Sequence, residues 1–164
     1  MIVHICTNLN TEIFQKVIKE LSLGFDTLVI YPKRKTTPEV YVEGLNVKSI
    51  IIGDTFFLKL QPIKALLIFA KIWPLVKEKK IDVFHCHTLM SDGLVGYFLS
   101  LVKSVPFIVA VRSSDLLILR RSMVARCIFK FIYFKANKIY TISITLKNKI
   151  PYKREDLIVV PNGI

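Results

Sequence analysis

The chain has 164 residues, a hydrophobic fraction of 52% and a formal net charge of +12. This length suits one domain with a sizeable core, and the scarcity of Gly and Pro argues against disorder. The three cysteines form no Cys-x-x-Cys pair, which argues against a disulfide framework and favours reduced thiols in a cytosolic compartment.

The first third of the chain predicts three strands and one helix. An apolar run predicts a central strand over Ile2–Thr7. Apolar residues at helical spacing then predict a helix over Glu12–Leu23. A second strand is predicted over Thr27–Tyr31, where Pro32 ends it, and a third over Val47–Ile52.

The middle of the chain alternates helices with strands. We predict a long helical segment over Phe56–Lys79, a strand over Asp82–Cys86 and a helix over Asp92–Lys103. A wholly apolar strand follows over Pro106–Val111, and then a helix over Arg120–Asn137. We expect the apolar stripe of this last helix to be buried; it consists of Met123, Val124, Cys127, Ile128, Phe131 and Ile132.

The end of the chain adds a strand over Lys138–Ser143, a short helix over Thr145–Ile150 and a strand over Leu157–Val160. Strands that alternate with helices at this spacing are typical of βαβ units. We therefore predict an α/β fold with a Rossmann-like open, mostly parallel sheet and helices on both of its faces.

Two apolar segments, Leu58–Val76 and Leu94–Val111, approach the length of a membrane span, but both contain Lys and Pro. We interpret them as core elements, with a transmembrane role as the alternative. The stretch Leu116–Arg154 has ten basic residues and no acidic one, which favours an anionic membrane surface contacted through Arg126 and Lys130. Nucleic acid is not an expected partner, because the neighbouring aromatic residues are predicted to lie in the core.

Polar residues follow the fourth predicted strand. His85 and His87 lie two residues apart on that strand, and therefore on one face. A helix N-terminus at Ser91, Asp92 and Gly93 comes next, at the edge of a parallel sheet where ligands bind. We expect His87 to contact a ligand and His85 to be buried and structural. A metal site is the rival interpretation, and we predict none because carboxylate or thiolate partners are not evident.

A second polar cluster, Arg112, Ser113 and Asp115, follows the fifth predicted strand. Arg112 could contact phosphate or acceptor hydroxyls, and Asp115 could accept hydroxyl protons; the alternative is a simple helix cap with a salt bridge. If the two strands are neighbours, both clusters line one cleft. No glycine-rich loop follows the first strand, which argues against an autonomous dinucleotide-binding domain or a P-loop ATPase. We expect no cofactor in this chain.

Four groups of residues carry a resemblance through their order and spacing. They are Asp82–Thr88 with Ser91–Gly93, Pro106–Asp115, Ile139–Ser143 with Leu146–Lys147, and Ile158–Ile164. Taken together, they resemble the N-terminal half of a glycosyltransferase of family 4, the retaining, nucleotide-sugar-dependent group with the GT-B fold. The resemblance covers essentially the whole chain.

The resemblance implies that residues 1–164 form a single acceptor-side domain. It implies that the donor-binding domain, with its Glu-x7-Glu motif and nucleotide-sugar contacts, is absent from this chain. Asn162 and Gly163 would then lie at the interdomain crossover, and Ser143 would be a structural residue. Two features depart from the family pattern: glycines are missing after the first strand, and Arg112 stands where a His is often found.

We therefore expect the acceptor-binding half of a retaining glycosyltransferase for cell-surface polysaccharide or lipid-linked glycan, inactive alone. A non-catalytic α/β ligand-binding module is the alternative. The expected partners are a glycan or lipid-linked acceptor, an anionic membrane surface and the missing C-terminal domain. The expected location is cytoplasmic, with peripheral attachment to the inner face of the membrane.

Overall fold

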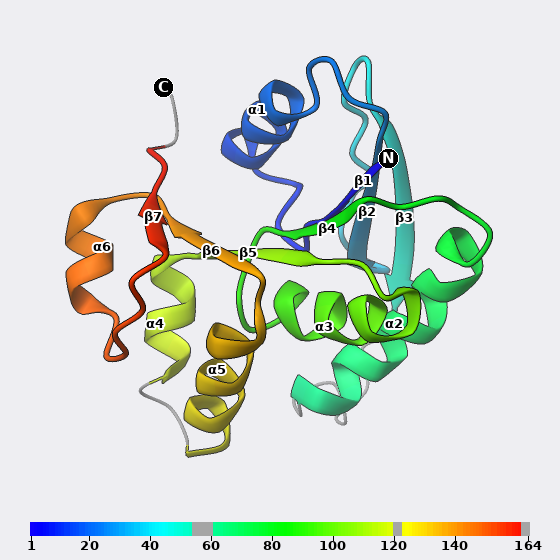
Figure 1. Ribbon diagram of the computed structural model, residues 1–164. Helices are drawn as coiled ribbons and strands as arrows, with labels where there is room; N and C mark the ends of the chain where they lie inside the picture. The colour runs from blue at the N-terminus through cyan, green and yellow to red at the C-terminus, as the bar shows by residue number, and fades with distance from the viewer. Residues whose placement is uncertain (54–60, 120–122, 162–164) are drawn as a thin grey trace.

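The computed structural model describes residues 1–53, 61–119 and 123–161. Its centre is a seven-stranded parallel sheet in the order β3-β2-β1-β4-β5-β6-β7 (Figure 1). The strands are β1 Ile2–Ile5, β2 Thr27–Arg34, β3 Asn46–Ile52, β4 Val83–Cys86, β5 Phe107–Val111, β6 Lys138–Thr141 and β7 Leu157–Val159. The helices are α1 Glu12–Leu21, α2 Gln61–Val76, α3 Asp92–Lys103, α4 Ser113–Leu119, α5 Met123–Lys135 and α6 Ile144–Lys149. The predicted α/β fold class is confirmed.

The order of the strands places a switch point between β1 and β4. The chain builds outward from β1 through β2 to β3, and then returns to pair β4 against the free side of β1. In the β1–β4 register His4 lies opposite His85. Loops that leave β1 and β4 diverge to opposite sides of this point, and such a divergence opens a crevice at the carboxyl edge of a doubly wound sheet.

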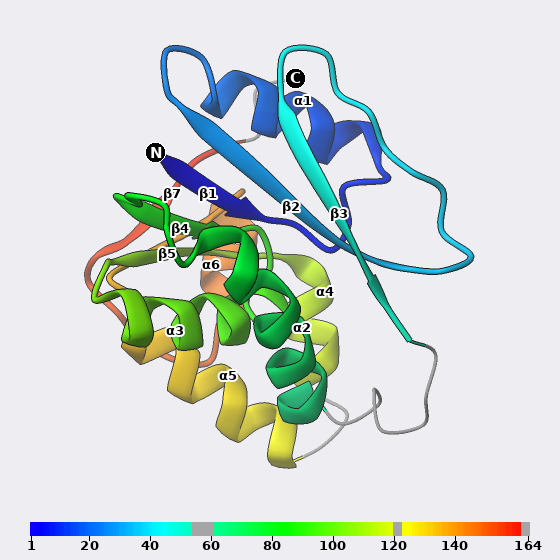
Figure 2. The same cartoon turned by 90° about the vertical axis from the view of Figure 1, so that its right-hand side faces the viewer.

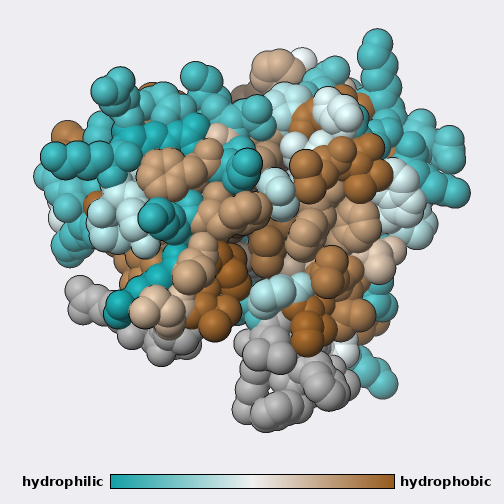
Figure 3. Space-filling view, turned by 60° about the horizontal axis from the view of Figure 1, so that its bottom comes forward, coloured by the Kyte–Doolittle hydropathy of each residue, from teal (hydrophilic) through white to brown (hydrophobic). Residues whose placement is uncertain are grey.

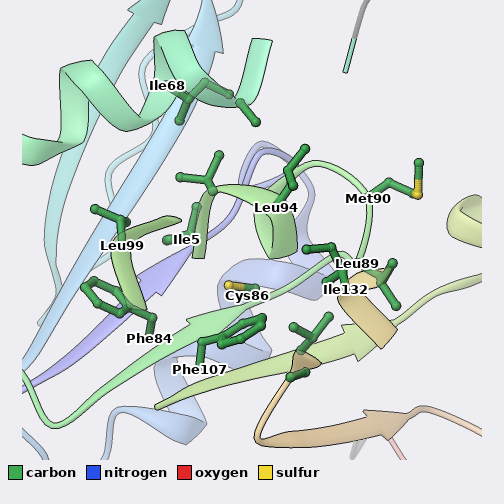
Figure 4. Packing of buried hydrophobic residues seen from close by; sticks show 14 of the residues in the cluster. Ile5, Ile68, Phe84, Cys86, Leu89, Met90, Leu94, Leu99, Phe107 and Ile132 are labelled. Carbon is green, nitrogen blue, oxygen red and sulfur yellow. The ribbon is translucent and has the colours of Figure 1, made fainter. Parts of the chain in front are cut away.

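The two faces of the sheet are covered differently. Helix α1 packs on one face, whereas α2, α3 and α5 pack on the other (Figures 1 and 2). The larger core lies beneath α2, α3 and α5, and Figure 4 shows Phe84, Phe107 and Ile132 meeting there. A smaller core under α1 contains Cys6, Leu9, Ile18, Val29 and Tyr31.

Helix α3 approaches β4 closely at one point. A Cβ atom added to Gly96 would lie 2.2 Å from the Sγ atom of Cys86, which is fully buried. Only a residue without a side chain fits between helix and strand at that distance. This contact fixes the depth of α3 on the sheet, and with it the position of the helix N-terminus at the carboxyl edge.

Strand β2 is longer than predicted, because Pro32 does not end it. Residues Thr27 to Ile30 pair with β1, whereas Tyr31 to Arg34 pair with β3 and not with β1. Pro32 therefore lies beyond the part of β2 that pairs with β1, where a residue without an N–H is tolerated. The consequence is that Lys33 and Arg34 extend beyond β1 at the edge where ligands would bind.

The predicted buried stripe of α5 is confirmed for Ile132, which is buried, and in part for Ile128, which packs half-buried against the core, but it is wrong for its other four residues. The side chains that face the core are Ala125, Phe129, Ile132 and Tyr133. Met123 is 70% exposed and Val124 62% exposed, and Cys127 and Phe131 also face outward. The helix is apolar nearly all round, so hydrophobic periodicity could not identify which side meets the sheet.

The predicted long helix ends earlier than expected. Within the described residues α2 spans Gln61–Val76, contains Pro74 and stops before Lys79. Residues 54–60 of the predicted segment lie outside the described residues. Helix α4 was not predicted; it directly follows β5 and carries the polar cluster that includes Asp115. No helix in the described ranges is long and apolar enough to span a bilayer.

Candidate functional site

A pocket of about 510 Å³ lies at the carboxyl edge of the sheet, beside the switch point. The segments after β1 and β4 form two of its walls, the ends of β2 and β3 a third, and α2 and α4 the remainder. Its polar lining comprises Thr7, Asn8, Asn10, Tyr31, Lys33, Arg34, Thr37, Lys64, Thr88, Ser91, Ser114 and Asp115. Hydroxyl, amide and cationic groups dominate this set, which suits a hydroxylated or anionic ligand.

Three basic side chains give the pocket its charge. The Nζ atom of Lys33 donates to the Thr37 carbonyl at 2.8 Å and lies 2.9 Å from a Glu39 carboxylate oxygen. Within the described residues, Lys64 has no such hydrogen bond or ion pair, and burial lowers the pKa of its ammonium. Lys64 is therefore the cation that is most available to a bound anion.

Asp92 connects the start of α3 to the end of β1. Its carboxylate accepts a hydrogen bond from the Thr7 backbone N–H at 3.3 Å, and the side chain is fully buried. Burial raises the pKa of Asp92 to about 7. Its second oxygen, Oδ2, has no hydrogen-bond partner among the described residues. Asp92 thus links the loop after β1 to the start of α3, next to the pocket residues Thr7 and Ser91, and with this pKa it changes charge near neutral pH.

Asp115 connects the loops that follow β4 and β5. Its carboxylate accepts hydrogen bonds from the backbone N–H groups of Leu89, Met90 and Arg112, at 2.9 to 3.2 Å. Burial raises the pKa of Asp115, although these three donors oppose the shift. A simple helix cap therefore does not describe Asp115 in full, because its one carboxylate holds two loops together. Its oxygens are committed to these backbone groups.

The histidines predicted from the sequence lie on the face covered by α1, and His4 joins them. His4 Nδ1 lies 3.0 Å from His87 Nε2, and His85 Nε2 lies 2.8 Å from the Tyr140 hydroxyl. Burial lowers the pKa of His4 to about 4 and that of His85 to about 3, and lowers the pKa of His87 strongly. All three imidazoles are therefore neutral at pH 7.

The expected burial of the two predicted histidines is reversed. His87 is fully buried beneath the Phe14 ring, with 5.9 Å between ring centroids, whereas His85 is only half-buried. Arg112 closes the site from β5: its Nε donates to the His87 carbonyl at 3.4 Å, and its guanidinium lies over Phe14. The α1 helix covers the end of β4 but not its middle, so the residue nearer the loop is the less accessible one.

The remaining predicted residues fall in different places. Ser91 and Asp115 line the pocket, Ser113 lines a separate pocket beside Leu116 and Arg126, and Gly93 packs against Ile132. The Oγ atom of Ser143 accepts a hydrogen bond from Leu146 N at the start of α6. Asn162 and Gly163 lie outside the described residues.

Sequence reasoning missed several residues that the fold brings to this edge, among them His4, Thr7, Lys33 and Lys64. His4 belongs to an apolar strand, Lys33 to the polar run after the strand predicted over Thr27–Tyr31, and Lys64 to a predicted helix. Their position in the fold is the one signal that could identify them. That position, close to the carboxyl edge of the sheet, becomes known only when the strand order is known. Strand order depends on long-range pairing, which local patterns do not encode.

Known proteins share both the sequence pattern and the fold. The family described as "Glycosyl transferase 4-like" matches residues 4–143. An uncharacterized glycosyltransferase of Methanocaldococcus jannaschii is 32% identical over 91 residues, which cover 55% of this chain and 26% of that protein. The matched region thus spans about a quarter of this relative's length.

Two solved structures show the same fold at low sequence identity. Sucrose-phosphate synthase from Thermosynechococcus elongatus superimposes with a TM-score of 0.69 at 13% identity, covering 98% of this chain and 47% of the other. UDP-N-acetylglucosamine 2-epimerase from Rickettsia bellii gives a TM-score of 0.63 at 9% identity, covering 96% and 43%. The family match spans most of the chain and includes the strands and loops that build the pocket, so this chain belongs to the glycosyl transferase 4-like family.

Proposed function

We propose that this chain binds the acceptor substrate of a retaining, nucleotide-sugar-dependent glycosyltransferase. The observation that carries the proposal is the polar, cationic pocket at the switch point between β1 and β4 in a member of this family. Saccharide acceptors present hydroxyl groups, which the hydroxyls of Thr7, Thr88 and Ser91 could bind. The nucleotide-sugar donor would be held by a second domain, so residues 1–164 alone would bind acceptor without transferring sugar.

The charges of the pocket favour an acceptor that carries phosphate. Lys33 and Arg34 project from the end of β2, and Lys64 approaches from α2. The Asp115 carboxylate on the same wall is occupied by backbone N–H groups. A phosphate group would therefore meet cations without meeting a free carboxylate from Asp115. This chemistry suits a lipid-linked acceptor in polysaccharide or lipid-linked glycan synthesis, where phosphate joins saccharide to lipid.

The first prediction tests the pocket by removing its least engaged cation. We expect Lys64→Gln to weaken binding of glucose 1-phosphate at least about 10-fold, because a charge-assisted hydrogen bond is worth roughly 1.5–3 kcal/mol. Glucose itself should bind both forms equally weakly. Isothermal titration calorimetry on the purified chain measures both affinities, with a nucleotide-sugar transfer assay run in parallel.

The matched control is Lys71→Gln, which removes an exposed cation from the same helix outside the pocket lining. Equal binding of glucose 1-phosphate by the Lys64 variant and the native chain would refute the phosphate site. Sugar transfer by the purified chain would contradict the assignment of the donor to another domain. Acceptor binding with no transfer even after fusion to a family donor domain would support the non-catalytic module instead.

A membrane surface is the second proposed partner, and it is favoured by the outer side of the α2–α3–α5 layer. Figure 3 shows apolar side chains gathered over this side of the molecule. The exposed apolar residues of these helices include Leu66, Leu67, Leu101, Val102, Met123, Val124 and Phe131. Lys130 and Lys135 are exposed on α5 beside them. A surface with both apolar and basic side chains matches a bilayer that exposes anionic headgroups.

The second prediction concerns this surface. The chain should bind vesicles that contain phosphatidylserine, and the paired change Lys130→Glu and Lys135→Glu should weaken binding at least about 10-fold. Binding should fall as salt rises, because exposed charges are screened over about 10 Å at 0.1 M ionic strength. Lys19→Glu on α1, across the sheet, is the matched control and should leave vesicle affinity nearly unchanged. Co-sedimentation measures all three proteins, and equal binding to neutral vesicles would argue against an electrostatic partner.

A further inference from the structure

Three imidazoles gather on the α1 side of the sheet, and they are all the histidines in the chain. His4 lies on β1, and His85 lies opposite it on β4. His87 follows two residues later, so its side chain emerges on the same face. Neighbouring strands in a sheet are about 5 Å apart, which brings three rings into one cluster without any loop.

The rings are close enough to share one ion. One nitrogen can be chosen from each ring so that all three nitrogens lie within 4.8 Å of one another. The His85 and His87 ring centroids are 4.6 Å apart, and those of His4 and His87 are 5.3 Å apart. Zinc binds imidazole nitrogen at about 2.0–2.1 Å, so tetrahedral ligands stand about 3.4 Å from one another. Side-chain rotations that move these nitrogens by less than about 2 Å would therefore bring them to the spacing of tetrahedral zinc ligands.

The hydrogen bonds of the cluster leave two ring nitrogens without a partner among the described residues. His4 Nδ1 and His87 Nε2 face each other at 3.0 Å, and a single proton lies between them. Their other ring nitrogens, His4 Nε2 and His87 Nδ1, are buried and have no hydrogen-bond partner among the described residues. The facing pair is therefore the part of the cluster that one ion could bridge. The outer nitrogens stay without a partner among the described residues whether or not an ion is bound.

We propose that His4, His85 and His87 form a binding site for a divalent transition metal, with Zn²⁺ as the ion of choice. Binding would turn the facing nitrogens of His4 and His87 into lone-pair donors and place each ring's proton on its outer nitrogen. No proton leaves the protein in this exchange, because each neutral imidazole keeps one. The sequence predicts no metal site because no carboxylate or thiolate partner is evident beside His85 and His87. The structure brings His4 on β1 to them as a third possible ligand.

The surroundings of His85 support this set of three ligands. The Tyr140 hydroxyl holds one nitrogen of His85 at 2.8 Å, which orients the ring and leaves its other nitrogen for the metal. His85 is half-buried, so an ion has a route to the cluster from its side. Three imidazoles also leave a fourth position for water or an anionic oxygen, as in zinc sites with open coordination.

One charge opposes the site. Arg112 acts on His85 and His87 electrostatically, and its guanidinium disfavours a nearby cation. We therefore expect Zn²⁺ to bind at roughly micromolar rather than nanomolar concentration. An anionic group in the fourth position would offset part of this repulsion.

The third prediction is tested with Zn²⁺ alone, added to the purified metal-free chain. Calorimetry should show one Zn²⁺ per chain, and Co²⁺ should give the visible absorption of a four-coordinate site. His85→Gln should weaken Zn²⁺ binding by about 100-fold or more, since it removes a ligand at the least buried position. Cys127→Ser, which removes the exposed thiol, is the matched control and should bind as the native chain does.

A second measurement does not depend on any variant. The ring nitrogens of all three histidines should shift together in ¹⁵N NMR spectra when one equivalent of Zn²⁺ is added, and the melting temperature should rise. Ring nitrogens that stay unchanged in excess Zn²⁺ would overturn the proposal. So would native-like Zn²⁺ affinity in His85→Gln, or loss of Zn²⁺ binding in Cys127→Ser.

Discussion

Replacing Asp115 with Ala is expected to lower the free energy of unfolding by about 3–5 kcal/mol, the largest effect of any single change at this edge. The carboxylate accepts hydrogen bonds from three backbone N–H groups, those of Leu89, Met90 and Arg112. Removing it leaves these donors buried without partners, at a cost of roughly 1–3 kcal/mol for each one that water does not reach. Urea denaturation of native and variant chains measures the difference.

The loss should be graded with the chemistry of the replacement. Asp115→Asn keeps one carbonyl oxygen but turns an NH₂ group toward N–H donors, so it should lose about half as much stability as Asp115→Ala. Ser114→Ala is the control, because Ser114 lies in the same turn of α4 and is exposed. A loss below about 1 kcal/mol for Asp115→Ala would show that water satisfies the two loops.

The same carboxylate illustrates what the sequence could and could not predict at the site. The pattern of strands and helices placed Asp115 after a buried strand, and the neighbouring polar loops followed from that position. Its three partners come from two loops separated by more than twenty residues along the chain. A local pattern contains no information on such partners, so the sequence predicts only a ligand contact or a helix cap for this residue.

The fold itself was predictable because each strand carries its own signal. Apolar runs of four to eight residues with helical segments between them specify βαβ units, and parallel pairing follows from that alternation. Strand register was not predictable, and register alone placed His4 opposite His85. The missing third histidine, and the metal site inferred from it, arise from that one pairing.

Burial was least predictable where an element is apolar on all sides. Helix α5 offered two apolar faces, and the sheet accepts the one with Ala125 and Phe129. The larger residues Met123 and Phe131 remain outside. A small residue such as Ala allows close packing of a helix on its neighbours, whereas a hydrophobicity count favours the larger side chains. Because these larger residues face outward, they form part of the exposed apolar surface that favours a membrane partner.

The second large effect concerns Asp92, whose variant Asp92→Asn is expected to be more stable than the native chain above pH 7. Burial raises the pKa of this carboxyl from an ordinary value of 3.8 to about 7 in the folded protein. The folded state therefore binds its proton more tightly than the unfolded state does. Stability from this group is fully present below about pH 4 and is lost as pH rises through about 7.

The size of the effect follows from the shift. One pKa unit corresponds to 1.36 kcal/mol, so a shift of about three units corresponds to roughly 2–4 kcal/mol once relaxation of the buried site is allowed for. An Asn side chain keeps an oxygen for the Thr7 N–H and cannot ionise. The native chain and Asp92→Asn should thus have similar stability near pH 4 and diverge by that amount at pH 8.

Chemical denaturation at intervals between pH 4 and pH 8 gives the difference curve between the two chains. Subtraction removes the contributions of the three histidines and of Asp115, which both chains share. Parallel curves across this range would mean that Asp92 ionises freely, and that the Thr7 N–H holds a carboxylate rather than a neutral acid. A divergence that grows from about pH 4 and levels off near pH 7 would instead show that the folded chain holds Asp92 as a neutral acid and is destabilised when it ionises. Acceptor binding by the native chain, and not by Asp92→Asn, would then change as pH rises through about 7, where the folded chain ionises.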